Sequence, residues 1–116
     1  MTDNSSEIVR KDILVRRDGK ALLELAGSGD KWAIRTVAMH YQGGEDYMLP
    51  EDSREAARWW QTLVEMNDPD AMFELAHMLL DNRYGIEDRS QARSLLERSA
   101  SLGNEEASEV LGQEFR

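Results

Sequence analysis

The chain has 116 residues, no cysteine and a formal net charge of −9 at pH 7. The length suits one domain, expected over residues 1–116 with 1–7 flexible, and the missing cysteine excludes disulfides and thiol chemistry. Residues 1–20 carry five basic and four acidic side chains, which leaves −10 for the remaining 96 residues. Such a body repels nucleic-acid phosphates and anionic membranes, so neither is expected as a partner, and a charged partner would have a basic surface.

The first residues contain no apolar run of the signal-peptide type, and no segment has the apolar length of a transmembrane helix. We therefore expect a cytoplasmic protein that is a monomer when free. The charge has a simpler alternative explanation, in which acidity serves only solubility.

Helical spacing of apolar and small residues runs through the whole chain, most clearly at positions 71, 72, 75, 76 and 79. It predicts six helices, in chain order, at residues 8–27, 30–42, 53–65, 69–81, 89–102 and 105–115. Asp30, Asp68 and Asn104 stand where helix N-caps belong, and Gly103 stands at a helix end. No segment shows the alternation of a strand, so the expected fold class is all-α.

Two elements recur alternately along the chain. The first is found in "GDKWAIRTVAMHY" (29–41), "NDPDAMFELAHML" (67–79) and "GNEEASEVLGQEF" (103–115), where Ala33, Ala71 and Ala107 align. The second is found in "EAARWWQTLVEMN" (55–67) and "SQARSLLERSASLG" (90–103), with a divergent copy at 13–29. We call the helices of the first element A helices and those of the second B helices, so the predicted order is B, A, B, A, B, A.

The adjacent Trp59 and Trp60 align with Leu95 and Leu96 of the next B helix. Neighbouring helical residues point about 100° apart, so the two rings cannot share one contact. A helix inside a stack of pairs is touched by its own partner and by the next pair, which predicts that each tryptophan fills one contact. The alternative is one buried and one half-exposed ring.

These residues resemble the Sel-one-like repeat family of tetratricopeptide-like α-solenoids. The pattern is small-x3-[VL]-[AG]-x2-[YLF], then a loop, then A-x2-[WL]-[WL] and a tight turn, clearest in "DPDAMFELAHMLLDNRYGIEDRSQARSLLERSASLGNEEA". Met66 and Asn67 depart from it, as does "LLDNRYGIED". The resemblance covers residues 20–115 and implies a right-handed solenoid of about three antiparallel helix pairs, with a concave face lined by A helices. It also implies a protein-interaction module and not a catalyst.

No constellation of residues predicts an enzyme, a metal site or a cofactor. His40 and His77 occupy non-equivalent repeat positions, and no His-x3-His or cysteine pair accompanies them. "GGED" (43–46) places Glu45 and Asp46 after a glycine pair, where they would repel a phosphate. Acid pairs such as Glu105 and Glu106 are typical of first helical turns.

If Leu75 is the buried anchor of its A helix, the concave face can be placed by spacing. The expected partner-binding residues share that inward direction: Trp32, Arg35, Met39, Phe73, His77, Asp81 and Glu109. Apolar anchors in a polar surround are typical of binding hot spots. Phe73 has a packing role as its alternative, whereas Trp32 has no large counterpart in the other copies.

The leading hypothesis is a non-catalytic module that binds a protein partner through its concave groove and acidic surface. Its sharpest form is an acidic inhibitor of a basic toxin, of the immunity-protein or antitoxin kind, because acidic inhibitors gain association rate by steering. Adaptor or regulatory roles stay open. The alternative class is a small-ligand-binding protein or a minor enzyme acting in the groove.

Overall fold

A computed structural model describes residues 5–43 and 48–115, and this part of the chain is helical without strands. The predicted acids Glu45 and Asp46 lie outside the described residues. The elements are α1 (Ser5–Arg16), α2 (Gly19–Gly27), α3 (Lys31–Gln42), α4 (Ser53–Glu65), α5 (Pro69–Leu80), the 3-10 turn η1 (Asn82–Tyr84), α6 (Arg89–Ser101) and α7 (Glu105–Glu114). The prediction of an all-α solenoid is confirmed.

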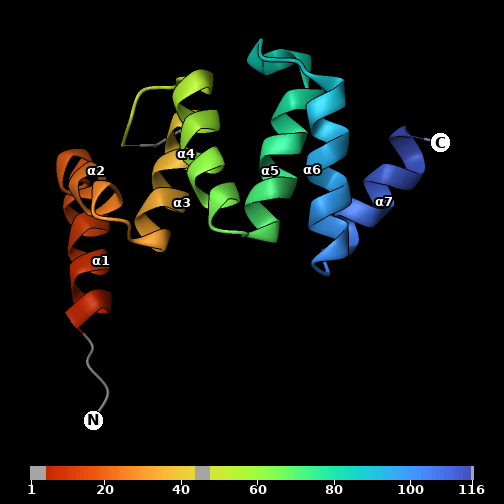
Figure 1. Cartoon of the computed structure of the whole chain (residues 1–116). Coiled ribbons are helices and arrows are strands. Elements are labelled where there is room, and N and C mark those ends of the chain that lie inside the picture. Colours follow the sequence, from red (N-terminus) through yellow and green to blue (C-terminus); the bar gives the residue numbers. More distant parts are fainter. Residues whose placement is uncertain (1–4, 44–47, 116) are drawn as a thin grey trace.

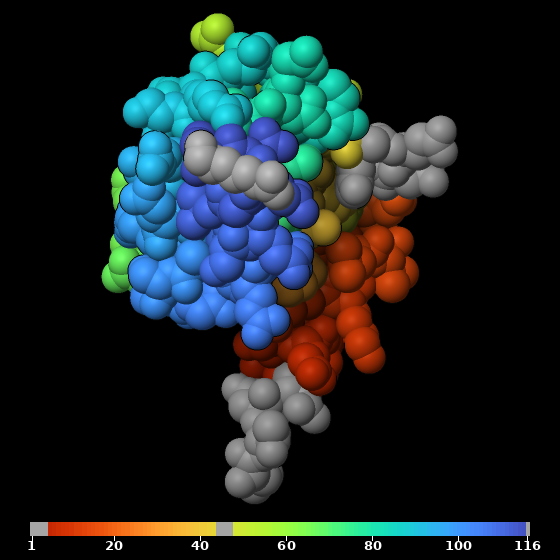
Figure 2. Space-filling model, turned by 90° about the vertical axis from the view of Figure 1, so that its right-hand side faces the viewer, coloured from red at the N-terminus to blue at the C-terminus, as the bar shows by residue number. Residues whose placement is uncertain are grey.

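Helices that follow one another in the chain also lie side by side in an elongated stack (Figure 1). The A helix α3 packs on the B helix α4, and α5 packs on α6, as two antiparallel pairs. Figure 2 looks at the opposite end from α1 and shows α7 on the near face beside α6. The molecule measures 46 × 35 × 20 Å, so every helix reaches the surface on at least one side.

The same turn joins each B helix to the next A helix. Its first residue is left-handed and its second is the N-cap of the A helix: Gly29–Asp30, Asn67–Asp68 and Gly103–Asn104. Each cap side chain accepts a hydrogen bond from the backbone N–H of the alanine three residues on, which confirms the predicted caps. Asn67, at φ 62°, takes the place of glycine because asparagine tolerates this conformation.

The prediction of one helix over residues 8–27 is wrong. Two helices occupy this stretch, because Arg17 is left-handed at φ 53° and Asp18 caps α2 by accepting from the backbone of Ala21 at 3.0 Å. The backbone N–H of Asp18 also bonds to the carbonyl of Ile13, which closes the end of α1. Asp18 therefore separates the two helices, because it follows the end of α1 and caps the start of α2 at Gly19.

One core of buried apolar side chains runs from Ile13 in α1 to Ala107 in α7. Trp60 belongs to it with 2% of its surface exposed, and its Nε1 donates to Oε1 of Gln42 at 3.0 Å. Trp59 is half-buried and packs against the core from outside. The expectation that both rings are buried is wrong, and the alternative of one buried and one half-exposed ring is confirmed.

Candidate partner-binding surface

A hollow of about 360 Å³ opens among the A helices and defines what we call the acidic hollow. The A helices α3 and α5 and the first turn of α7 form its walls, and α4 contributes one ring. Its lining residues are Arg35, Met39, Trp60, Asp70, Phe73, Glu74, Asn104 and Glu106. Three residues that the spacing assigns to the concave face, Arg35, Met39 and Phe73, are therefore brought together.

The apolar part of the acidic hollow consists of Met39, Phe73 and an edge of Trp60. Met39 is an apolar side chain that is 46% exposed. Methionine is flexible, so it can adapt its shape to a bound group. Phe73 is half-buried and also packs against the core, so it supports the fold and faces the hollow at once. An exposed thioether beside a half-buried ring gives an incoming apolar chain a place to lie.

The charged part is dominated by the carboxylates of Asp70, Glu74 and Glu106. Burial raises the pKa of Glu74, the charge of His77 opposes this, and the nearby Glu106 raises the pKa further. Within residues 5–43 and 48–115, Glu74 has no hydrogen-bond or ion-pair partner. A half-buried carboxylate whose charged form is disfavoured would gain from a cation placed beside it.

Arg35 supplies the positive charge of the hollow, but the fold already uses it. Its guanidinium donates to Asp68 at 2.6 Å and lies 3.9 Å from Asp70, so it ties α3 to the N-terminus of α5. Asp68 caps α5 through its other carboxylate oxygen. Arg35 therefore neutralises acids of the next repeat, and the carboxylates of Glu74 and Glu106 dominate the remaining charge of the hollow.

His77 and Asp81 lie in a separate hollow of about 560 Å³ between α5 and α7. His77 is exposed there. Asp81 is occupied locally, because its carboxylate accepts from the backbone of Arg83 at 2.9 Å and pairs with that guanidinium. The hydrogen bond from the Arg83 backbone is the main reason that the pKa of Asp81 is lowered. The predicted single groove is thus divided into two hollows along α5.

Trp32 and Glu109 line neither hollow. The assignment of Trp32 to the partner-binding set stays a prediction, but its ring is half-buried, packs against the core and lies under Arg10 of α1, 5.3 Å from guanidinium carbon to ring centre. Glu109 is exposed on α7. Spacing within an A helix could not reveal this, since the cover over Trp32 comes from a helix earlier in the chain.

The predicted partner-binding set leaves out five residues that line the acidic hollow: Trp60, Asp70, Glu74, Asn104 and Glu106. Helical spacing does direct Asp70 and Glu106 toward the groove. Glu74 carried a usable signal, since it is four residues after Asp70 and adjacent to Phe73. Trp60 carried none, because it comes from a B helix. In the described part of the chain, no three His, Asp or Glu side chains are grouped to hold a metal ion. In that same part, no helix has the length and apolarity needed to cross a bilayer.

Comparison with protein families gives two consecutive matches to a model described as the Sel1 repeat, at residues 33–68 and 69–104. The second match contains α5, its connecting loop, α6 and the turn that follows, and the first begins two residues inside α3 and continues through α4 and its turn. The boundary falls between Asp68 and Pro69, at the repeated turn. Comparison with curated proteins gives no match.

Proposed function

Because the chain belongs to the Sel1 repeat family, we propose that it is a non-catalytic, cytoplasmic interaction module whose acidic hollow captures a basic segment of a protein partner. Sel1 repeats generally mediate protein–protein interaction. The observation that carries the proposal is the position of Glu74, a half-buried carboxylate without an ion pair in the described chain, between Phe73 and the acids of two helices.

A lysine or arginine side chain matches both parts of the acidic hollow. Its methylene stem would lie on Met39 and Phe73, while its charged end would reach Glu74 and Glu106. Burial disfavours the charged form of a carboxylate, so a neighbouring cation stabilises a half-buried carboxylate more than an exposed one. Met39 and Phe73 keep the partner-binding role predicted from the sequence. Arg35 instead connects α3 to the start of α5 through its ion pair with Asp68.

The finer form of the proposal is an acidic inhibitor of a basic protein, of the immunity-protein or antitoxin kind. Residues 48–115 carry 15 acidic and six basic side chains, a net charge of −9. Such a body accelerates encounter with a basic enzyme, and this acceleration falls as salt screens the charges. An adaptor would use the same hollow. Capture of a toxic protein in a one-to-one complex would favour the inhibitor over the adaptor.

The test compares three immobilised baits by quantitative mass spectrometry of captured proteins. They are the wild type, the Glu74→Gln/Glu106→Gln variant, and a Glu24→Gln/Glu65→Gln control that removes equal charge from exposed positions outside the hollow. We expect a basic protein on the wild type and the control, and at least a tenfold loss on the hollow variant, the scale of truncated anchors. Equal capture by all three baits would contradict the role of the acidic hollow.

A further inference from the structure

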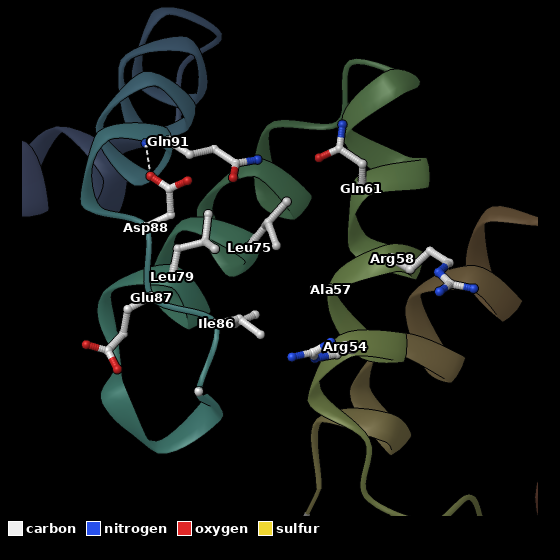
Figure 3. A pocket seen from close by; sticks show the side chains of 11 residues that line it. Arg54, Ala57, Arg58, Gln61, Leu75, Leu79, Ile86, Glu87, Asp88 and Gln91 are labelled. Atoms are coloured by element: carbon white, nitrogen blue, oxygen red, sulfur yellow. Dashed lines mark hydrogen bonds between the residues drawn. The ribbon is translucent and has the colours of Figure 1, made fainter.

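A third hollow lies on the other side of α5, between the B helices α4 and α6, and we call it the α4–α6 groove (Figure 3). Its volume is about 600 Å³. Leu75, Leu79 and Ile86 form an apolar floor, with Leu75 and Leu79 themselves belonging to the core. Ile86 belongs to the connection between η1 and α6 and points into the space, so the floor continues out of the core toward solvent.

The charge that the α4–α6 groove offers comes from Arg54. In the described chain Arg54 has no hydrogen bond or ion pair, and Figure 3 shows its guanidinium reaching toward Ile86. Arg58, one turn later, points away and pairs with Glu55 at 3.1 Å. On the opposite wall, Glu87 also points away, and the Asp88 carboxylate accepts from the backbone N–H of Gln91 as the cap of α6.

Two side-chain amides frame the other end of this groove. Gln61 of α4 and Gln91 of α6 extend toward each other from opposite walls (Figure 3), and neither side chain has a hydrogen-bond partner among the described residues. Each amide offers N–H donors and a carbonyl acceptor, which can bond to the C=O and N–H groups of a peptide backbone. The pair is therefore suited to holding a backbone between them.

We propose that the α4–α6 groove binds an extended peptide segment of a protein partner that carries an apolar side chain next to a carboxylate. The apolar side chain lies on Leu75, Leu79 and Ile86, the backbone bonds to the glutamine amides, and the carboxylate pairs with Arg54. Charge complementarity selects this occupant, because Arg54 directs a positive charge without a partner in the described chain into the groove, whereas the Asp88 carboxylate is already engaged as the cap of α6. This preference is opposite to that of the acidic hollow and is independent of the function proposed above, so one molecule can hold two segments of opposite charge.

The probe is the peptide acetyl-Ala-Leu-Asp-Leu-Ala-amide, compared with the same peptide containing asparagine in place of aspartate. Both are titrated into the ¹⁵N-labelled full-length protein and followed by two-dimensional NMR. We expect shifts at the side-chain amides of Gln61 and Gln91 and at the backbone of Leu79 and Ile86. The aspartate peptide should bind about three- to fivefold tighter than the asparagine peptide, the contribution of an exposed ion pair.

Arg54→Gln should remove the difference between the two peptides, and the matched Arg58→Gln variant should retain it. Both arginines are exposed on the same helix, so a general effect of lost charge would act on both equally. The proposal is overturned if the peptides do not bind, if the shifts lie in the acidic hollow, or if Arg54→Gln and Arg58→Gln behave alike. The folded spectrum of each variant is recorded in the same experiment.

Discussion

Replacing Trp60 by alanine should destabilise the protein far more than the same change at its neighbour Trp59. Trp60 is 2% exposed within the core, whereas Trp59 packs against that core from a half-buried position. The indole of Trp60 also donates to Gln42, whose amide in turn donates to Tyr84 at 3.3 Å. The Trp60→Ala change therefore leaves a cavity and breaks a link between α4, α3 and η1.

The size of the effect follows from the buried area. A tryptophan ring hides about 150–250 Å², which at about 25 cal/mol per Å² corresponds to roughly 4–6 kcal/mol as an upper bound. Gln42 is half-buried, so water can replace the lost hydrogen bond at small cost. We expect a loss of about 4 kcal/mol in the free energy of unfolding for Trp60→Ala, and about 1–2 kcal/mol for Trp59→Ala.

Urea denaturation followed by far-ultraviolet circular dichroism measures this loss without relying on tryptophan fluorescence. With a slope of about 2 kcal/mol per molar urea, the midpoint should fall by about 2 M for Trp60→Ala and by less than 1 M for Trp59→Ala. Trp60→Phe keeps most of the ring and should fall between the two. Equal midpoints for the two alanine variants would refute the assignment of Trp60 as the core tryptophan.

Three further predictions concern the pH dependence of stability, the packing of Trp32 and the pH dependence of partner binding. Burial lowers the pKa of His40 from its ordinary 6.5, so the unfolded chain takes up this proton first and stability should fall as the pH drops below about 6.5. His40 Nδ1 accepts from the Met48 backbone, and melts of His40→Gln at about pH 7.5 and 5.5 should show a smaller difference than the wild type. Trp32→Ala should lower the melting temperature by several degrees, because Arg10 and the core cover that ring; an unchanged melt would restore Trp32 as a surface residue. Since the pKa of Glu74 is raised, capture of a basic partner should weaken as the pH falls toward the carboxyl range, and Glu74→Gln should flatten that profile in a binding titration.

Local signals in the sequence were sufficient for the repeats and for most of the helices. Asp30, Asp68 and Asn104 cap their helices through bonds to the third residue on, an interaction that needs no distant contact. The aligned Ala33 and Ala71 belong to the buried face that the helical spacing predicts. In a solenoid each repeat contacts only its neighbours, so a pattern that repeats in sequence specifies the stack directly.

The tertiary structure decided which exposed-looking residues are covered and how the binding surface is divided. Trp32 lies under Arg10, and Trp60 rather than Trp59 enters the core, because neighbouring residues of a helix point about 100° apart and only one of the two rings faces the packed helices. Arg35 is engaged by Asp68 from the next repeat, which leaves Glu74 and Glu106 as the carboxylates of the acidic hollow without an ion pair among the described residues. Spacing fixes the direction of a side chain around its own helix, whereas cover, charge pairing and hollows depend on where the neighbouring helices lie.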